Sequence, residues 1–199
     1  MSTSPDPVVL DWVTAALEGD QDAFAELVYA FQDSVYNLCY RMLSDRGEAE
    51  DAAQETFLRA YLNLQRYDPA RSFKTWLLTI ASNHCIDRIR RRRMTWLSIE
   101  DDPLPALTLR SDEPEPEDAS IKEEQSREIQ ALLQELNPDY RAAVALRYWY
   151  DYSYTEIADI LDTTESAIKS RLFRARQILA EKINPKTASG ALTALLENV

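Results

Sequence analysis

Residues 153–182 read SYTEIADILDTTESAIKSRLFRARQILAEK, a pattern typical of two short helices joined by a turn. Ser153 and Glu156 have the spacing of a capping box, in which each side chain satisfies a free backbone N–H of the first helical turn. A polar turn follows, and Thr163 or Thr164 can cap a second helix. We therefore expect a helix-turn-helix in this part of the chain.

The second of these helices has two contrasting faces. Ile168, Leu172, Ala175 and Leu179 recur at helical spacing and form an apolar face. The opposite face is polar and basic, and it carries Ser166, Lys169, Ser170, Phe173, Arg174 and Gln177, flanked by Arg171 and Arg176. This combination is typical of a helix that reads DNA in the major groove. The alternative is an ordinary amphipathic surface helix, but such a helix has little use for an exposed aromatic ring among its cations.

The composition of the chain predicts an all-α protein. The 199 residues carry a formal net charge of -12, so contact with DNA requires local positive surface. Only three glycines are present, 45% of the residues are hydrophobic, and the periodicity is helical nearly throughout. The longest uncharged stretch, residues 75–86, is too short and too polar for membrane insertion, and without a leader at the N-terminus we expect a cytoplasmic location. Cys39 and Cys85, in apolar helical stretches without a C-x-x-C pattern, are expected to be buried free thiols rather than a redox switch.

A change in composition divides the chain into two small helical domains. Residues 100–118 are rich in Asp, Glu and Pro, with Arg110 as their one cation, and such a stretch cannot bury enough apolar surface to fold alone. We expect an acidic, Pro-rich linker over 96–122. It is either a passive tether or an acidic strand that threads a basic channel on a partner. Around it we place a domain at 8–95, a second domain at 123–184 that contains the helix-turn-helix, and a tail at 185–199.

The third predicted helix, from Arg46 to about Leu64, has an unusual solvent face. Its buried face is predicted to hold alanines and aromatic residues, Tyr61 among them. The far side places Leu58 and Leu62 among carboxylates and an amide, namely Asp51, Gln54 and Glu55. An apolar centre with an acidic rim is typical of a docking surface for another protein. Scattered surface leucines are the alternative.

The fourth predicted helix, about Phe73 to Arg92, changes character along its length. Its first half is apolar and includes Trp76, which suits a core position or a stacking platform for a base. Its end carries five arginines, Arg88, Arg90, Arg91, Arg92 and Arg93, more than a helix terminus needs, and such a cluster suits phosphate groups. Between the halves, Asn83 offers a donor and an acceptor that suit a base edge.

Three motifs together give the chain a family resemblance over about residues 10–184. These are DAAQETFLRA at 51–60, FKTWLLTIASN at 73–83 and IKSRLFRAR at 168–176. In this order and with an acidic linker between them, they resemble the bacterial extracytoplasmic-function (ECF) sigma factors, which are two-domain promoter-specificity subunits of RNA polymerase. The resemblance implies no enzymatic activity, no cofactor and no metal. It implies core RNA polymerase, promoter DNA and an anti-sigma factor as partners.

The resemblance also implies roles for individual residues. The surface that docks on the clamp helices of the largest polymerase subunit corresponds to Asp51, Gln54, Glu55, Leu58, Arg59 and Leu62. The minus-ten element, with a flipped base at Asn83, would be melted and read by Arg71, Lys74, Trp76, Asn83, Arg88, Arg90 and Arg91. The minus-thirty-five element would be read by Ser166, Lys169, Ser170, Phe173 and Arg174, with Arg171 and Arg176 on phosphates. The second domain is expected on the flap of the second-largest subunit, and the linker near the active-site cleft and the RNA exit path.

Two other classes of protein are weighed against this resemblance. A stand-alone helix-turn-helix regulator, acting without docking on polymerase, leaves the arginine run and the Leu58 and Leu62 face unexplained. A small helical enzyme has little support from a sequence with one histidine and no phosphate loop or metal-ligand spacing. In the tail, Ala191, Leu192, Leu195 and Leu196 are compatible with a short amphipathic helix.

Overall fold

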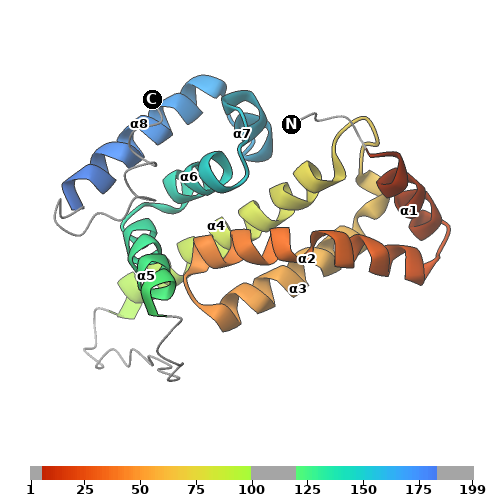
Figure 1. The fold of residues 1–199 in the computed structure, drawn as a ribbon, viewed down its shortest axis with the longest axis horizontal. Coiled ribbons are helices and arrows are strands. Elements are labelled where there is room, and N and C mark those ends of the chain that lie inside the picture. The colour runs from red at the N-terminus through yellow and green to blue at the C-terminus, as the bar shows by residue number, and fades with distance from the viewer. Residues whose placement is uncertain (1–5, 100–119, 183–199) are drawn as a thin grey trace.

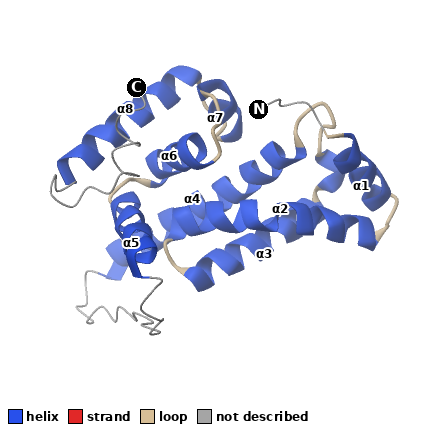
Figure 2. Cartoon of the chain, viewed as in Figure 1, coloured by secondary structure: helices blue, strands red, loops and turns tan. Residues whose placement is uncertain are grey.

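The computed structural model describes residues 6–99 and 120–182. Every regular element in these two ranges is a helix, which confirms the predicted all-α class (Figure 2). The acidic stretch 100–118 and the predicted tail helix around Ala191 lie outside the described residues. Within the described ranges, no helix combines the length and the apolar character that crossing a membrane requires.

The N-terminal part of the chain folds as four α-helices and a short 3-10 turn. Their bounds are α1 Pro7–Leu17, α2 Gln21–Leu43, α3 Arg46–Leu62, η1 Leu64–Arg66 and α4 Phe73–Ile99. Aspartates cap two of these helices: the Asp20 carboxylate accepts hydrogen bonds from the first turn of α2, and Asp45 accepts one from the backbone N–H of Glu48. Gly19, with φ at 99°, separates α1 from α2 in a conformation that glycine adopts without strain. The helix α4 continues well past the expected end near Arg92.

The C-terminal part consists of four more helices, which include the predicted helix-turn-helix. Their bounds are α5 Ser120–Gln134, α6 Pro138–Trp149, α7 Tyr154–Ile160 and α8 Glu165–Lys182. The capping box is complete, because Ser153 and Glu156 each accept a backbone N–H from the other residue. Thr164, one of the two expected caps, accepts a hydrogen bond from Ala167 at the start of α8. The strongest local signals of the sequence therefore fix both helices of the motif.

The core of the N-terminal part lies where α2 packs against α1, α3 and α4. Leu27, Leu38, Met42 and Leu77 are among its fully buried side chains. The prediction that Tyr61 is buried is wrong, because its side chain is 43% exposed. Its ring lies at the edge of the α3 interface and meets Phe24 edge-on, with ring centroids 4.9 Å apart.

Both cysteines are buried and free, as predicted, and the fold brings them together. The two thiols are hydrogen-bonded between α2 and α4. This bond and burial raise the pKa of the Cys85 thiol far above its ordinary value. A protonated, enclosed thiol is a poor nucleophile, so the pair behaves as packing.

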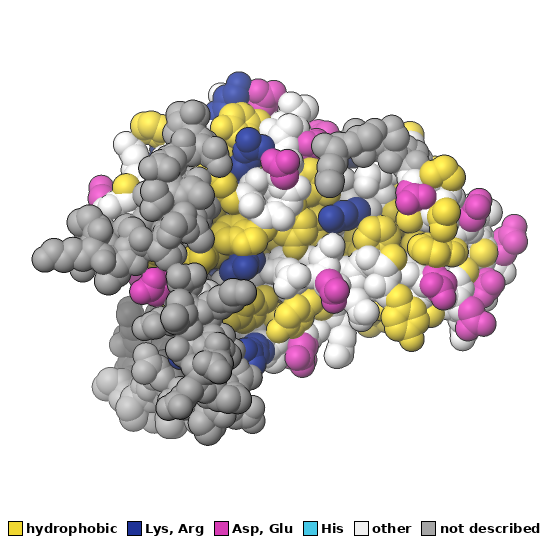
Figure 3. Space-filling view, in the orientation of Figure 1, with side chains coloured by type: hydrophobic (Ala, Val, Ile, Leu, Met, Phe, Trp, Pro, Cys, Tyr) yellow, Lys and Arg dark blue, Asp and Glu magenta, His cyan; other side chains and the backbone are white. Residues whose placement is uncertain are grey.

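The two groups of helices are packed against each other in the described structure (Figure 1). α6 contacts both α2 and α4, α7 contacts α4, and α5 contacts the end of α2. Two side chains from the C-terminal group hold that end of α2: Gln130 donates to the carbonyl of Tyr40, and Arg141 donates to the carbonyl of Met42. On the face shown in Figure 3, carboxylates gather at the end of the molecule that carries α1, while lysine and arginine side chains lie nearer the middle.

Candidate polymerase and nucleic-acid interfaces

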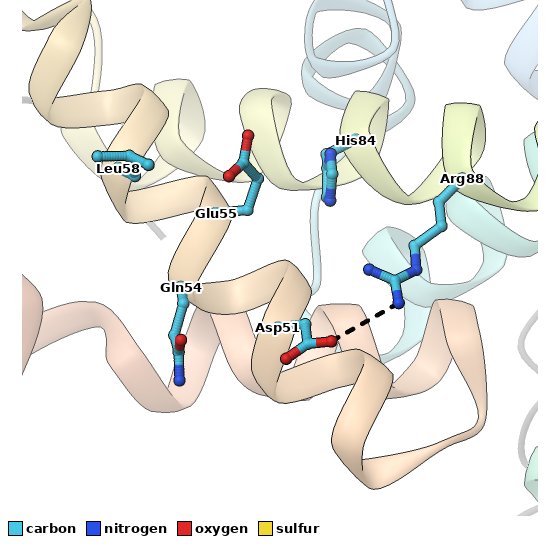
Figure 4. Close-up of a pocket in the computed structure, with 6 residues that line it drawn as sticks. All are labelled: Asp51, Gln54, Glu55, Leu58, His84 and Arg88. Carbon is cyan, nitrogen blue, oxygen red and sulfur yellow. Dashed lines mark ion pairs between the residues drawn. The ribbon is translucent and has the colours of Figure 1, made fainter.

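The solvent face of α3 borders a hollow of about 540 Å³ between α3 and α4 (Figure 4). The hollow is lined by Asp51, Gln54, Glu55, Leu58, His84 and Arg88. Leu58 is 52% exposed and Leu62, on the same helix, is 70% exposed, so both predicted surface leucines are uncovered. This gives the acidic helix an apolar centre that its own chain leaves open.

The charged residues of this face are paired along and across the helices. Arg59 donates to Glu55 over 2.6 Å, and this hydrogen bond lowers the pKa of the Glu55 carboxyl below its ordinary value. Arg88 reaches back from α4 to Asp51, with 3.8 Å between Nη2 and Oδ2. The fold therefore places Arg88, predicted at the minus-ten DNA, beside the predicted docking residues.

His84 also lines the hollow, although no role was predicted for it there. Its imidazole is partly buried, and no described group hydrogen-bonds to its buried Nε2. Burial lowers the pKa of His84, and the nearby Arg59 and Arg88 lower it further. The ring is therefore neutral at pH 7. Its position four residues before Arg88, on the same side of the helix, is the signal that could have identified it.

The residues predicted at the minus-ten element lie along α4 and the loop before it. Asn83 and Arg71 are exposed. Trp76 is partly buried in an aromatic cluster, with ring centroids 5.3 Å from Tyr67 and 5.5 Å from Phe73. The cluster packs at the start of α4 and leaves the Trp76 side chain partly exposed.

Other predicted minus-ten residues engage groups of their own chain. Lys74 lies 5.5 Å from the centre of the Tyr150 ring, and Arg90 is paired with Asp139 at 2.8 Å. Both partners belong to the C-terminal part of the chain: Asp139 lies in α6 and Tyr150 directly follows it. Arg91 has an exposed side chain on the same helix. Residues of α4 therefore face three environments: the hollow beside α3, the C-terminal part of the chain, and solvent.

The predicted reading face of α8 is open to solvent. Ile168, Leu172, Ala175 and Leu179 are buried on the apolar side, as expected. The exposed side presents Ser166, Lys169, Ser170, Phe173 and Arg174. Lys169 is held by Glu165 at 2.7 Å, and Arg174 lies 3.5 Å from the hydroxyl of Tyr140. Arg171 and Arg176 are partly buried at the border, and Arg171 turns toward Asp139, with 3.6 Å between the charged atoms.

Two family matches place this chain in a known class of proteins. Residues 27–95 match the family described as Sigma-70 region 2, and residues 126–179 match Sigma-70, region 4. The first range spans the main N-terminal helices, and the second contains the helix-turn-helix. We use the names region 2 and region 4 for these two parts of the chain.

The full-length relatives narrow the class to one family. The chain is 42% identical to the ECF RNA polymerase sigma factor SigW of Bacillus subtilis over 171 residues, covering 83% of this chain and 91% of SigW. Among solved structures, CnrH in complex with the cytosolic domain of CnrY has a TM-score of 0.63, with 23% identity and coverage of 88% and 96%. The sigma factor RpoE of Bartonella quintana, in complex with the anti-sigma factor NepR, has a TM-score of 0.60, with 23% identity and coverage of 79% and 94%. The chain belongs to the ECF RNA polymerase sigma factors.

Membership of this family confirms the predicted function at the level of the whole chain. The protein binds core RNA polymerase and directs transcription initiation at particular promoters. The stand-alone helix-turn-helix regulator is not favoured, because the match to Sigma-70 region 2 accounts for the helices which that alternative left unexplained.

Proposed function

We propose that three surfaces of this chain divide the work of promoter recognition. The exposed face of α3 docks on the clamp helices of the largest polymerase subunit, α4 and its preceding loop melt and read the minus-ten element, and α8 reads the minus-thirty-five element. Region 4 also contacts the flap of the second-largest subunit. The chain acts in the cytoplasm, where the chromosome lies.

The observation that carries this proposal is the exposure of Leu58 and Leu62 beside the acidic hollow. Large apolar side chains that border carboxylates and a cavity suit the centre of a protein interface. A partner that approaches with basic and apolar side chains would cover the leucines and meet Glu55 at the rim. Leu58 and Leu62 are exposed while the N-terminal and C-terminal helices are packed against each other. Docking on the polymerase can therefore precede contact with DNA.

The open face of α8 supports the assignment to duplex DNA. Lys169 and Arg174 are exposed, and both end in donors that fit guanine in the major groove. Phe173 can contact a thymine methyl group. Arg171 and Arg176 lie at the border of this face, where phosphates pass when a helix enters the groove.

Run-off transcription tests the proposal. Bacterial core RNA polymerase is incubated with fragmented genomic DNA from the source, with and without the chain. We expect discrete new transcripts that share an upstream sequence, and the Asn83→Ala variant should lose them while it still co-elutes with the core enzyme. Absence of both transcripts and co-elution would contradict the assignment of α3 as a docking face.

We also propose that an anti-sigma factor controls the chain. Support comes from RpoE of Bartonella quintana, which has a similar fold and was solved in complex with the anti-sigma factor NepR. A tagged chain should co-purify from its source with a protein that suppresses run-off transcription. If every co-purifying protein leaves transcription unchanged, this control is refuted.

A further inference from the structure

Asp139, at the start of α6, holds one arginine from each predicted DNA-binding helix. Its Oδ2 lies 2.8 Å from Nη2 of Arg90 on α4, and its Oδ1 lies 3.6 Å from Nη2 of Arg171 on α8. One carboxylate therefore lies between two guanidinium groups that are far apart in the sequence.

This geometry resembles the contact of an arginine with a phosphate. Carboxylate and phosphate oxygens accept hydrogen bonds from a guanidinium in the same manner. Arg90 and Arg171 are both predicted to meet promoter DNA, Arg90 at the minus-ten element and Arg171 on a phosphate. In the closed chain Asp139 occupies the groups that DNA would use.

The rest of the seam between regions 2 and 4 is rich in aromatic and polar contacts. Tyr150 donates its hydroxyl to the carbonyl of Ser34 and places its ring under Lys74, another predicted minus-ten residue. The hydroxyl of Tyr152 lies 3.4 Å from that of Thr75. Polar interfaces between domains separate more readily than apolar cores.

The closed arrangement cannot serve both promoter elements at once. The minus-ten and minus-thirty-five elements lie about 25 base pairs apart, which is about 85 Å along B-DNA. Arg90 and Arg171 meet at a single carboxylate. The two DNA-binding helices must therefore move apart before one promoter can engage both of them.

We propose that the Asp139 carboxylate is an autoinhibitory latch: it closes region 4 onto region 2 in the free chain and must release both arginines before DNA is bound. The proposal rests on the proposed function, because that function assigns the two arginines to DNA. Release is coupled to docking on the polymerase, which separates the two regions. The free chain is held from DNA by its latch as well as by its net charge of -12.

The test compares Asp139→Asn with a matched control, Asp151→Asn. Both variants lose one negative charge in region 4. The Asp151 side chain is 91% exposed and pairs with Arg147 inside region 4, and its backbone φ of 54° is one that asparagine tolerates. Small-angle scattering of the free chain measures opening, and fluorescence anisotropy with a short duplex of arbitrary sequence measures DNA binding across a salt titration.

We expect Asp139→Asn to increase the radius of gyration and Asp151→Asn to leave it unchanged. Release of two arginines to phosphates should make the slope of log affinity against log salt steeper by about 1.8. Between 50 and 200 mM salt, Asp139→Asn should therefore lose about tenfold more affinity than the wild-type chain. Equal slopes for the two variants would refute the latch, as would tighter DNA binding by Asp139→Asn without any opening.

A second variant, Tyr150→Phe, guards against a folding defect at the start of α6. It removes the hydrogen bond to Ser34 and leaves Asp139 and both arginines in place. We expect partial opening and a smaller change in the same direction. Run-off transcription distinguishes failure of the proposed function from failure of the latch. If the wild-type chain supports no transcription, the proposed function is refuted. If transcription is normal and neither variant opens, the latch alone is refuted.

Discussion

Removing Leu58 and Leu62 together should weaken binding to core RNA polymerase without unfolding the chain. The two side chains are 52% and 70% exposed, so together they expose about one whole leucine side chain. Burying a leucine contributes about 1.5–3 kcal/mol. If the polymerase covers both residues, the double alanine variant should bind about 10- to 100-fold more weakly.

The matched control is Leu17→Ala on α1, whose side chain is 45% exposed and lies on a helix outside the docking face. Affinity is measured by competition between the unlabelled variants and a fluorescent wild-type chain for purified core enzyme. Thermal unfolding should change little for either variant, because none of the three leucines is in the core. The docking role of Leu58 and Leu62 is refuted if the affinity of the double variant for core enzyme stays within twofold of the wild type. It is also refuted if Leu17→Ala loses as much affinity as the double variant.

Three further predictions concern α8, the helix-turn-helix and the hollow. Arg174→Ala should cost about 1–3 kcal/mol at the minus-thirty-five element, measured by holoenzyme binding to promoter variants, and an equal loss on every sequence would mark Arg174 as a phosphate contact instead. Ser153→Ala removes a capping box and should destabilise the chain by about 1 kcal/mol in urea unfolding, and a loss below a few tenths would show that the cap is dispensable. The pKa of His84 is lowered in the folded chain from its ordinary value of 6.5. As the pH falls below 6.5, the unfolded chain therefore binds the proton before the folded chain does, and the free energy of unfolding should decrease. His84→Asn should reduce the difference in urea midpoint between pH 7.5 and 5.5, and an unchanged difference would contradict the burial of a neutral ring.

Local signals in the sequence were sufficient for the helices and their caps. The Ser153–Glu156 box and the Thr164 cap act within one helical turn, so the residues that decide each boundary are next to it. The predicted end of α4 near Arg92 is too early. A run of arginines is compatible with a helix terminus, but arginine is also a good helix former, and the helix continues to Ile99.

Contacts between distant parts of the chain could not be predicted in the same way. Helical periodicity predicts Tyr61 on the buried face of α3. Tyr61 lies at the border of that face, where its burial depends on how far the Phe24 side chain covers it. The pairing of Arg88 with Asp51 and the meeting of Cys39 with Cys85 depend on how α4 packs. The sequence pattern of each helix is compatible with several such arrangements.

The contact of Gln130 and Arg141 with the end of α2 has an evolutionary consequence. Both side chains bind backbone carbonyls, those of Tyr40 and Met42, and every amino acid supplies a carbonyl. The side chains of α2 near these carbonyls can therefore diverge without loss of the contact. A chimaera that joins region 2 of one family member to region 4 of this chain should therefore retain these two hydrogen bonds, whereas the Arg90–Asp139 pair would form only where the donor of region 2 also has an arginine at that position.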